Sequence, residues 1–126
     1  MKTIITTKNA PAPIGPYNQA VLYGDTLYTS GQIAIHPQTN ILVLDDIKTE
    51  TKQVMENLKA VLEAANMTFE NVIKSTIFIS NMDDFGLINE VYGSYFGDTS
   101  GPARETVQVA RLPKNVNVEI SMIAAK

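Results

Sequence analysis

Alternating hydrophobic and polar positions indicate extended segments in the first third of the chain. The proline-rich stretch at residues 8–17 excludes a helix and favours a rigid loop, because proline lacks a backbone N–H and restricts the residue before it. Gly24 and Asp25 separate two apolar runs, which is typical of a hairpin turn. We therefore expect three strands here, the second and third of them adjacent: residues 2–7, 20–23 and 26–31.

The spacing changes to that of a helix after Asp45 and Asp46, either of which can cap it. Hydrophobic side chains then recur every three to four residues to about Asn66, and charged residues lie on the opposite side. The pattern predicts that this helix packs through one face only. That face comprises Ile47, Val54, Met55, Leu58, Val61, Leu62 and Ala65.

The second half of the chain begins with its strongest strand pattern, at residues 72–80, which is apolar on both faces and therefore predicts a central, buried strand. A shorter helix is predicted from about residue 84 to residue 96. Asp83 and Asp84 at its start are interpreted as helix caps rather than as a metal pair. Two more strands close the chain: residues 106–110 and 115–125.

The order of elements is three strands, a helix, a strand, a helix and two strands. This order predicts an α+β fold, with two helices packed on one face of a six-stranded mixed sheet, as a single domain spanning residues 1–126. The other face of the sheet then needs a partner, and the side chains that point there decide what kind.

Arg104 is the first candidate for a functional residue. In an extended segment it shares one face with Thr106, whereas Val107 lies on the other face. Two interpretations remain open at this point. The guanidinium either pairs loosely with a neighbour such as Glu105 on a solvated sheet face, or binds an anion.

Glu119 on the last strand is the second candidate. If the last two strands pair as a hairpin around Pro113 and Lys114, Thr106 lies opposite the neighbourhood of Glu119. Arg104 and Glu119 would then project from the same sheet face and share a cavity. They either form a structural ion pair or have separate roles, in which Arg104 holds a carboxylate at two points and Glu119 holds or deprotonates a water.

Composition and charge exclude several classes of function. The net charge is −3 and the ten lysines and arginines are scattered, so the positive stripe of a nucleic-acid-binding protein is missing. There is no cysteine, and the only histidine, His36, precedes a proline in a turn, which argues against thiolate catalysis, metal centres and a Ser-His-Asp arrangement. We expect no cofactor and, without a leader or an apolar membrane segment, a cytoplasmic protein.

Five segments in order and at matching spacing resemble the Rid family of reactive intermediate deaminases, also called the YjgF family, in its archetypal RidA-like branch. The likeness runs from about residue 3 to the C-terminus. The segments are IGPY at 14–17, TSGQI at 29–33, NMDDF at 81–85, NEVYGSYF at 89–96 and PARETVQVARLPKNVNVEI at 102–120.

The resemblance implies a chorismate-mutase-like fold that assembles as a homotrimer, with equivalent sites in the clefts between subunits. It also implies hydrolysis of reactive 2-imino acids, such as 2-iminobutanoate and 2-iminopropanoate, to 2-oxo acids and ammonia. That activity would protect other enzymes from the enamine tautomers and needs no metal or organic cofactor.

The same resemblance assigns roles to individual residues. Arg104 matches the arginine that binds the substrate carboxylate, Glu119 the acid that positions the attacking water, and Tyr17 the tyrosine of the catalytic site. The substrate-binding positions of the family correspond here to four residues: Ser30, Gly31, Asn89 and Thr106.

Thr106 is a departure from many archetypal members, which have cysteine there. If the position contributes only its backbone carbonyl, threonine can replace cysteine, and its β-branching suits a strand. Two other functions stay open: a non-catalytic module that binds 2-oxo acids and regulates isoleucine or purine metabolism, and, against the acidic charge, a ribonuclease.

Overall fold

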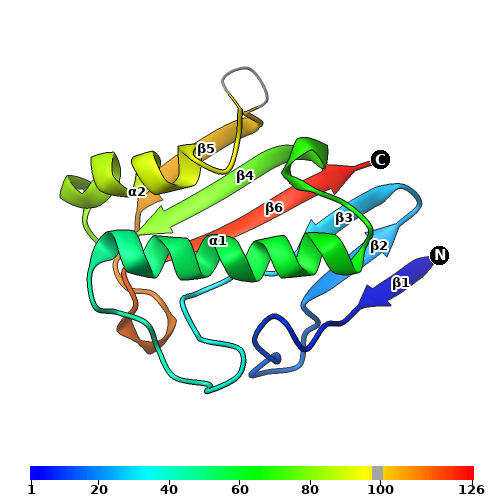
Figure 1. Ribbon diagram of the computed structural model, residues 1–126, viewed down its shortest axis with the longest axis horizontal. Helices are drawn as coiled ribbons and strands as arrows, with labels where there is room; N and C mark the ends of the chain where they lie inside the picture. Colours follow the sequence, from blue (N-terminus) through cyan, green and yellow to red (C-terminus); the bar gives the residue numbers. More distant parts are fainter. Residues whose placement is uncertain (98–100) are drawn as a thin grey trace.

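A computed structural model describes residues 1–97 and 101–126 and arranges them in two layers (Figure 1). A six-stranded mixed sheet forms one layer, and α1 (Ile47–Ala64) and α2 (Phe85–Gly93) together cover one of its faces. The predicted α+β fold with two helices on one side of the sheet is therefore confirmed. Within the described ranges, neither helix combines the length and hydrophobicity that crossing a membrane requires.

Three antiparallel strands form one end of the sheet, as their alternating pattern predicts. Gly24, at a positive φ of 60°, forms the turn between the second and third strands, which confirms the hairpin. Glycine has no side chain to clash in this conformation, so it is the residue that the turn favours. The three strands are β1 (Lys2–Ile5), β2 (Ala20–Tyr23) and β3 (Thr26–Thr29).

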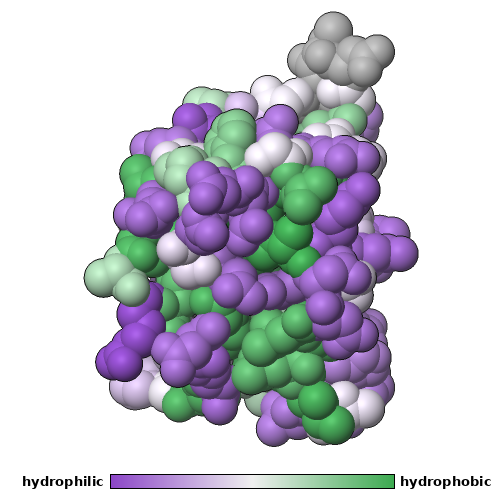
Figure 2. Space-filling view, turned by 90° about the vertical axis from the view of Figure 1, so that its left-hand side faces the viewer, coloured by the Kyte–Doolittle hydropathy of each residue, from purple (hydrophilic) through white to green (hydrophobic). Residues whose placement is uncertain are grey.

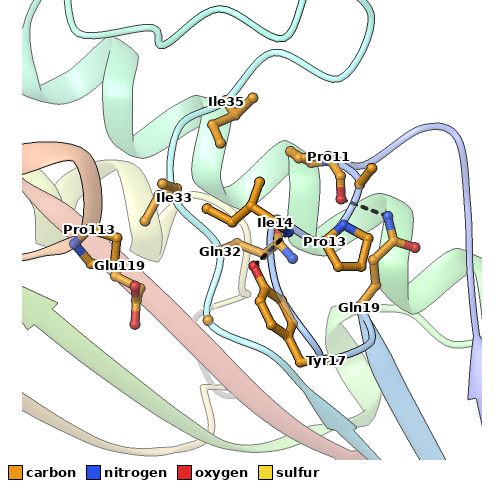
Figure 3. A pocket seen from close by; sticks show the side chains of 12 residues that line it. Pro11, Pro13, Ile14, Tyr17, Gln19, Gln32, Ile33, Ile35, Pro113 and Glu119 are labelled. Atoms are coloured by element: carbon orange, nitrogen blue, oxygen red, sulfur yellow. Dashed lines mark hydrogen bonds between the residues drawn. The ribbon is translucent and has the colours of Figure 1, made fainter.

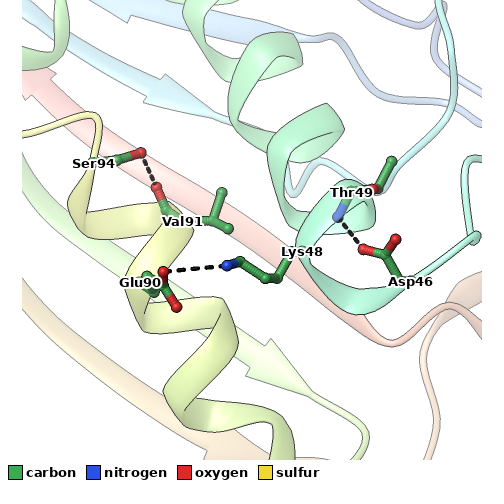
Figure 4. A network of polar contacts seen from close by, with 6 residues as sticks. All are labelled: Asp46, Lys48, Thr49, Glu90, Val91 and Ser94. Atoms are coloured by element: carbon green, nitrogen blue, oxygen red, sulfur yellow. Dashed lines mark hydrogen bonds and ion pairs between the residues drawn. The ribbon is translucent and has the colours of Figure 1, made fainter.

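Asp46, one of the two residues that the sequence suggested as caps, caps α1. Its Oδ1 accepts a hydrogen bond of 2.8 Å from the backbone N–H of Thr49 (Figure 4). Hydrogen bonds from Thr49 hold the pKa of the Asp46 carboxyl below its ordinary value. In the first turn of α1, Lys48 Nζ lies 3.2 Å from Glu90 Oε1 and links α1 to α2 at the surface.

The start of α2 differs from the prediction. A 3-10 turn (Met82–Asp84) precedes the helix, and Asn81 caps that turn by accepting a hydrogen bond of 3.0 Å from the N–H of Asp83. Asp84 at the start of α2 makes no capping hydrogen bond through its side chain. The interpretation of Asp83 and Asp84 as caps is therefore wrong. The extra turn starts before them in the chain, so the residue that caps its free N–H groups is Asn81.

The order of the last strands also differs from the prediction. β4 lies between its two neighbours, antiparallel to one and parallel to the other, so the two C-terminal strands do not form a hairpin. The segment between them contains a 3-10 turn (Pro113–Asn115), and it carries the chain past β4 to the other side. The three strands are β4 (Val72–Ile79), β5 (Ala103–Gln108) and β6 (Val118–Ala125).

This order places Arg104 and Glu119 on opposite faces of the sheet. Arg104 is the partner of Ser75 in the parallel pair of β4 and β5, and Ser75 is fully buried on the face beneath the helices. Glu119 is the partner of Phe78, whose side chain points to the other face because strand side chains alternate. The expectation that one chain brings Arg104 and Glu119 into one cavity is therefore wrong.

The main core lies between α1 and the helix-covered face of the sheet. Hydrophobic positions of the predicted stripe, from Val54 to Leu62, are fully buried there, and so are the inward-facing residues of β4 and β6. The opposite face of the sheet carries exposed hydrophobic side chains, among them Tyr28, which is 50% exposed, and Val107, which is 42% exposed. Hydrophobic burial therefore stabilises one face, and the other is left without a covering layer in a single chain.

Candidate active site

A small cavity of about 70 Å³ lies where the proline-rich loop and the segment after β3 meet the start of β6 (Figure 3). The loop contributes Pro11, Pro13 and Tyr17, and β6 contributes Glu119. Gly31 and the residues that follow it form another wall. Three of the seven residues that the sequence suggested, Tyr17, Gly31 and Glu119, are therefore brought together here.

The carboxyl group of Glu119 lines this cavity. The side chain is half-buried, and this burial raises the pKa of the Glu119 carboxyl above its ordinary value of 4.5. Burial removes water from the carboxylate and so favours its protonated form. A carboxylate with a raised pKa that is open to a small cavity has the properties of a general base or a water-binding group.

Gly31 leaves the space that the Glu119 carboxylate occupies. A Cβ atom built on Gly31 would lie 2.6 Å from Oε2 of Glu119 and 2.8 Å from its Cδ, which is closer than carbon and oxygen atoms approach one another. Any other residue at position 31 therefore displaces the carboxylate. Glycine is favoured here by the close approach of the Glu119 side chain rather than by backbone conformation.

Buried hydrogen bonds hold the proline-rich loop in place. Gln19 is 3% exposed, and its Nε2 donates to the carbonyl oxygens of Thr7, Ala10 and Pro11 at 2.8 to 3.2 Å. Its Oε1 accepts from the N–H of Thr7 at 2.7 Å. One side chain thus satisfies the backbone of a loop that forms neither helix nor strand, and it makes this wall of the cavity rigid.

Tyr17 lies at the open side of the cavity, with 46% of the residue exposed. Its hydroxyl accepts a hydrogen bond of 3.3 Å from the N–H of Ile14 (Figure 3). Ser30 is adjacent to Gly31, but its hydroxyl donates to the carbonyl of Asn18 at 2.5 Å and does not line the cavity. In a single chain Ser30 therefore stabilises the loop that carries Tyr17.

Arg104 belongs to a second group of residues, beneath α2. Its Nη1 donates a hydrogen bond of 2.6 Å to Oδ1 of Asn89. The guanidinium also lies over two aromatic rings, 5.1 Å from the centroid of Tyr92 and 5.6 Å from that of Phe85. These contacts orient the guanidinium, and among the described residues its only hydrogen bond is the one to Asn89. The loose pair with Glu105 is absent, since Glu105 contacts Lys74 Nζ at 3.3 Å.

Thr106 lies two residues from Arg104, on the same face of β5. Its Oγ1 is buried and has no hydrogen-bond partner among the described residues. Buried hydroxyl groups in proteins nearly always have a partner, so this oxygen marks the position as unusual. The second group therefore comprises Arg104, Asn89 and Thr106.

The sequence reasoning missed the aromatic neighbours of Arg104. These neighbours are Phe85 and Tyr92, and their spacing of seven residues, which places both on one helix face, is the signal that could have indicated them. It also missed Ile33 and Ile35, which line the cavity of Glu119. Among the described residues, no three histidine, aspartate or glutamate side chains cluster in a way that could hold a metal ion.

The surface on the side of the molecule where α1 begins is divided between hydrophobic and hydrophilic side chains (Figure 2). Exposed hydrophobic residues there and at the start of α2 include Met82, Phe85 and Leu87. The net charge of the chain is −3, which is unfavourable for general binding of a polyanion such as nucleic acid.

Known proteins share both the sequence and this architecture. Residues 7–126 match the family described as Endoribonuclease L-PSP. A RutC family protein of Pyrococcus horikoshii is 53% identical over 126 residues, covering 100% of this chain and 99% of that one. The mouse 2-iminobutanoate/2-iminopropanoate deaminase is 44% identical, covering 100% of this chain and 93% of the mouse protein.

Similarity to a solved structure extends over the whole chain. YyfA from Yersinia pestis, a protein of the Rid family, has 48% sequence identity and a TM-score of 0.97, and all of both chains is covered. The fold, the motifs around Tyr17, Gly31, Arg104 and Glu119, and these relatives agree. The chain therefore belongs to the Endoribonuclease L-PSP family, that is, to the Rid or YjgF family that its motifs resemble.

Proposed function

We propose that this protein hydrolyses reactive 2-imino acids, such as 2-iminobutanoate and 2-iminopropanoate, to 2-oxo acids and ammonia, at sites shared between two copies of the chain. The observation that carries the proposal is the pair of half-sites. Glu119 with Tyr17 and Gly31 lies on one face of the sheet, and Arg104 with Asn89 on the other. Two chains are needed to bring the guanidinium to the carboxylate.

The exposed sheet face supports such an assembly. Its hydrophobic side chains include Ile4, Tyr23, Tyr28 and Val107, all more than 40% exposed in one chain. A homotrimer, in which each chain uses one half-site toward each neighbour, buries this face and completes equivalent sites by rotational symmetry. Analytical ultracentrifugation measures the assembly, and a monomer at assay concentration would contradict it.

In this mechanism the substrate carboxylate binds N–H donors of the Arg104 guanidinium, while Glu119 of the neighbouring copy holds a water beside the imine carbon. The water oxygen attacks that carbon as its proton passes to the Glu119 carboxylate. The Glu119 carboxyl then gives this proton to the carbinolamine nitrogen. The C–N bond breaks as the carbinolamine hydroxyl forms the carbonyl and returns its proton to Glu119, and ammonia leaves with this proton as ammonium together with the 2-oxo acid. A protonated imine is already electrophilic, so position and charge provide the acceleration without a cofactor.

A reaction that generates its own substrate tests the proposal. Threonine dehydratase releases 2-iminobutanoate in the assay, and the rate of 2-oxobutanoate formation is compared with and without this protein. We expect acceleration by the wild type. Unchanged rates with a folded assembly, together with saturable binding of 2-oxobutanoate, would instead favour a regulatory module that binds 2-oxo acids. Affinity for single-stranded RNA that falls steeply with salt would favour a ribonuclease.

Gly31→Ala provides a test inside one half-site. The added Cβ meets the Glu119 carboxylate at 2.6 Å, and a flexible side chain yields more readily than backbone. We expect kcat to fall about tenfold or more because the water-holding carboxylate moves, with a small change in melting temperature. Gly86→Ala is the matched control, since a Cβ there meets no atom within 4 Å. Equal kcat in both variants would exclude this role for Gly31.

We also propose where the protein acts and what it binds. A single Rid domain over residues 1–126 acts in the cytoplasm, where dehydratases that use pyridoxal phosphate form the imines. Its partners are its own copies and a small imino or 2-oxo acid, without nucleic acid or membrane. Separation of cell fractions followed by immunodetection tests the location, and detection in the membrane fraction would contradict it.

A further inference from the structure

Three polar residues of α1 are buried, and two of them, Glu50 and Asn57, form hydrogen bonds to segments outside the helix. Glu50 is 0% exposed and Asn57 is 1% exposed, and their spacing of seven residues places them on the same side, two turns apart. Both interrupt the apolar stripe that packs on the core. A charged group is rarely fully buried without a specific partner, so each needs an account of what it binds.

Glu50 binds the residue at which the chain enters β6. Its Oε2 accepts a hydrogen bond of 2.7 Å from the backbone N–H of Asn117, and its Oε1 accepts one of 2.7 Å from Nδ2 of the same residue. The Asn117 Oδ1 in turn accepts from the hydroxyl of Ser80 at 3.2 Å. No lysine or arginine among the described residues pairs with Glu50. Its bonds therefore fix the backbone two residues before Glu119.

Asn57 binds the opposite wall of the same cavity. Its Nδ2 donates to the carbonyl oxygens of Ile33 and Ile35 at 3.2 and 3.0 Å, and its own Oδ1 accepts from Gln53 at 2.9 Å. Ile33 and Ile35 line the cavity directly after Gly31. The side chain therefore holds, through two carbonyl groups, the segment that leaves space for the Glu119 carboxylate.

The two walls are also joined to each other below the cavity. The N–H of Gln32 donates to the carbonyl of Ile120 at 2.8 Å, and the N–H of Ile120 donates to the carbonyl of Gln32 at 3.1 Å. Gln32 follows Gly31, and Ile120 follows Glu119. One helix face and one pair of backbone bonds thus determine how Gly31 and Glu119 lie relative to each other.

We propose that Glu50 and Asn57 are positioning residues, which hold the two walls of the Glu119 cavity so that the carboxylate stays at the distance that hydrolysis requires. The inference rests on the proposed function for its catalytic consequence. Neither residue touches substrate. A purely structural role would be met at least as well by hydrophobic residues, because burying a charge costs free energy that a well-packed apolar side chain does not.

An exchange of the amide and the carboxylate tests the role of Glu50. Glu50→Gln replaces one acceptor oxygen by an NH₂ group that faces an N–H donor, and Asn117→Asp places two carboxylates together. Each single change breaks one bond of the pair. The double variant Glu50→Gln/Asn117→Asp restores both, because the new amide donates to the new carboxylate while its oxygen accepts from the backbone N–H.

Thr51→Val is the matched control. Thr51 is also 0% exposed on α1, but its hydroxyl donates only to the carbonyl of Ile47, at 2.7 Å, within the helix. Loss of this bond lowers the melting temperature without touching either wall of the cavity. The control therefore separates a loss of stability from a change in the position of the site.

Two readouts make the outcomes distinct. We expect Glu50→Gln to lower kcat about tenfold with little change in KM, and to raise amide hydrogen exchange at Gln32 and Ile120 about tenfold. The double variant recovers both, and Thr51→Val changes neither. Loss of thermal stability alone in Glu50→Gln, or no recovery in a folded double variant, would overturn the inference. If the wild type shows no turnover, the proposed function fails, and hydrogen exchange alone still tests the positioning.

Discussion

Glu119→Gln is expected to abolish turnover while raising the melting temperature at neutral pH. The amide retains the shape of the side chain but does not accept a proton from water, so kcat falls about 100-fold or more. The gain in stability follows from the environment of the carboxyl. Burial makes its ionised form unfavourable in the folded state, and a neutral amide removes that cost.

The pH dependence has a defined sign. The folded-state pKa of Glu119 lies above the ordinary value of 4.5, so the folded protein binds this proton more tightly than the unfolded chain does. The contribution of Glu119 to stability is therefore present at low pH and is lost as pH rises through the raised pKa. Activity is expected to rise as pH rises through the same range, because only the ionised carboxylate can accept a proton from water. The pH at which kcat/KM falls on the acidic side is therefore expected to lie above 4.5.

Rates of 2-oxobutanoate formation and thermal unfolding curves across pH measure both effects. Glu105→Gln is the control, since Glu105 is an exposed carboxylate whose pKa is lowered by hydrogen bonds from Thr76 and Lys74. It is expected to change neither turnover nor the pH profile. Turnover retained in Glu119→Gln would show that the carboxylate does not serve as the base.

Arg104→Ala is the second change with a large expected effect. Removal of the guanidinium leaves the substrate carboxylate without its ionic partner, and kcat/KM is expected to fall on the order of 100-fold, mainly through KM. Arg104→Lys is expected to recover only part of this loss, because an ammonium group does not offer two parallel N–H donors. A collapse of the folded assembly in both variants would instead assign Arg104 a structural role through Asn89, Tyr92 and Phe85.

A mixture of two inactive variants tests whether the sites are shared. Arg104→Ala chains keep Glu119, and Glu119→Gln chains keep Arg104. After the two proteins are unfolded and refolded together in equal amounts, random association in a trimer leaves about a quarter of the sites with both native residues. We expect activity near that fraction. If each chain contained a complete site, the mixture would remain as inactive as its components.

A second mixture is the control. It contains wild-type chains and chains that carry both Arg104→Ala and Glu119→Gln, refolded together in equal amounts. If sites are shared between chains, about a quarter of the sites are intact; if each chain contains its own site, about half are intact. The two mixtures together therefore distinguish shared sites from sites within one chain. Gel filtration before the assay verifies that the chains have reassembled.

The sequence by itself determined the local elements and the chemical character of the site. The periodicity of residues 47–65 predicted α1 and its buried stripe, and the cap at Asp46 and the turn at Gly24 followed from local chemistry. These features depend on neighbouring residues, which is why a pattern is enough to predict them. The motifs around Arg104 and Glu119 likewise indicated the family before any geometry was known.

Only the tertiary structure decided which residues meet. The sequence favoured a hairpin of the last two strands, but β4 lies between them, parallel to β5 and antiparallel to β6. Its central place was expected, but only its face beneath the helices is buried, since Lys74 and Thr76 lie on the other face. That one non-local pairing moved Arg104 and Glu119 to opposite faces. Glu50 and Asn57 became visible in the same way, since hydrogen bonds to Asn117 and to the carbonyls after Gly31 join residues that are far apart in the chain.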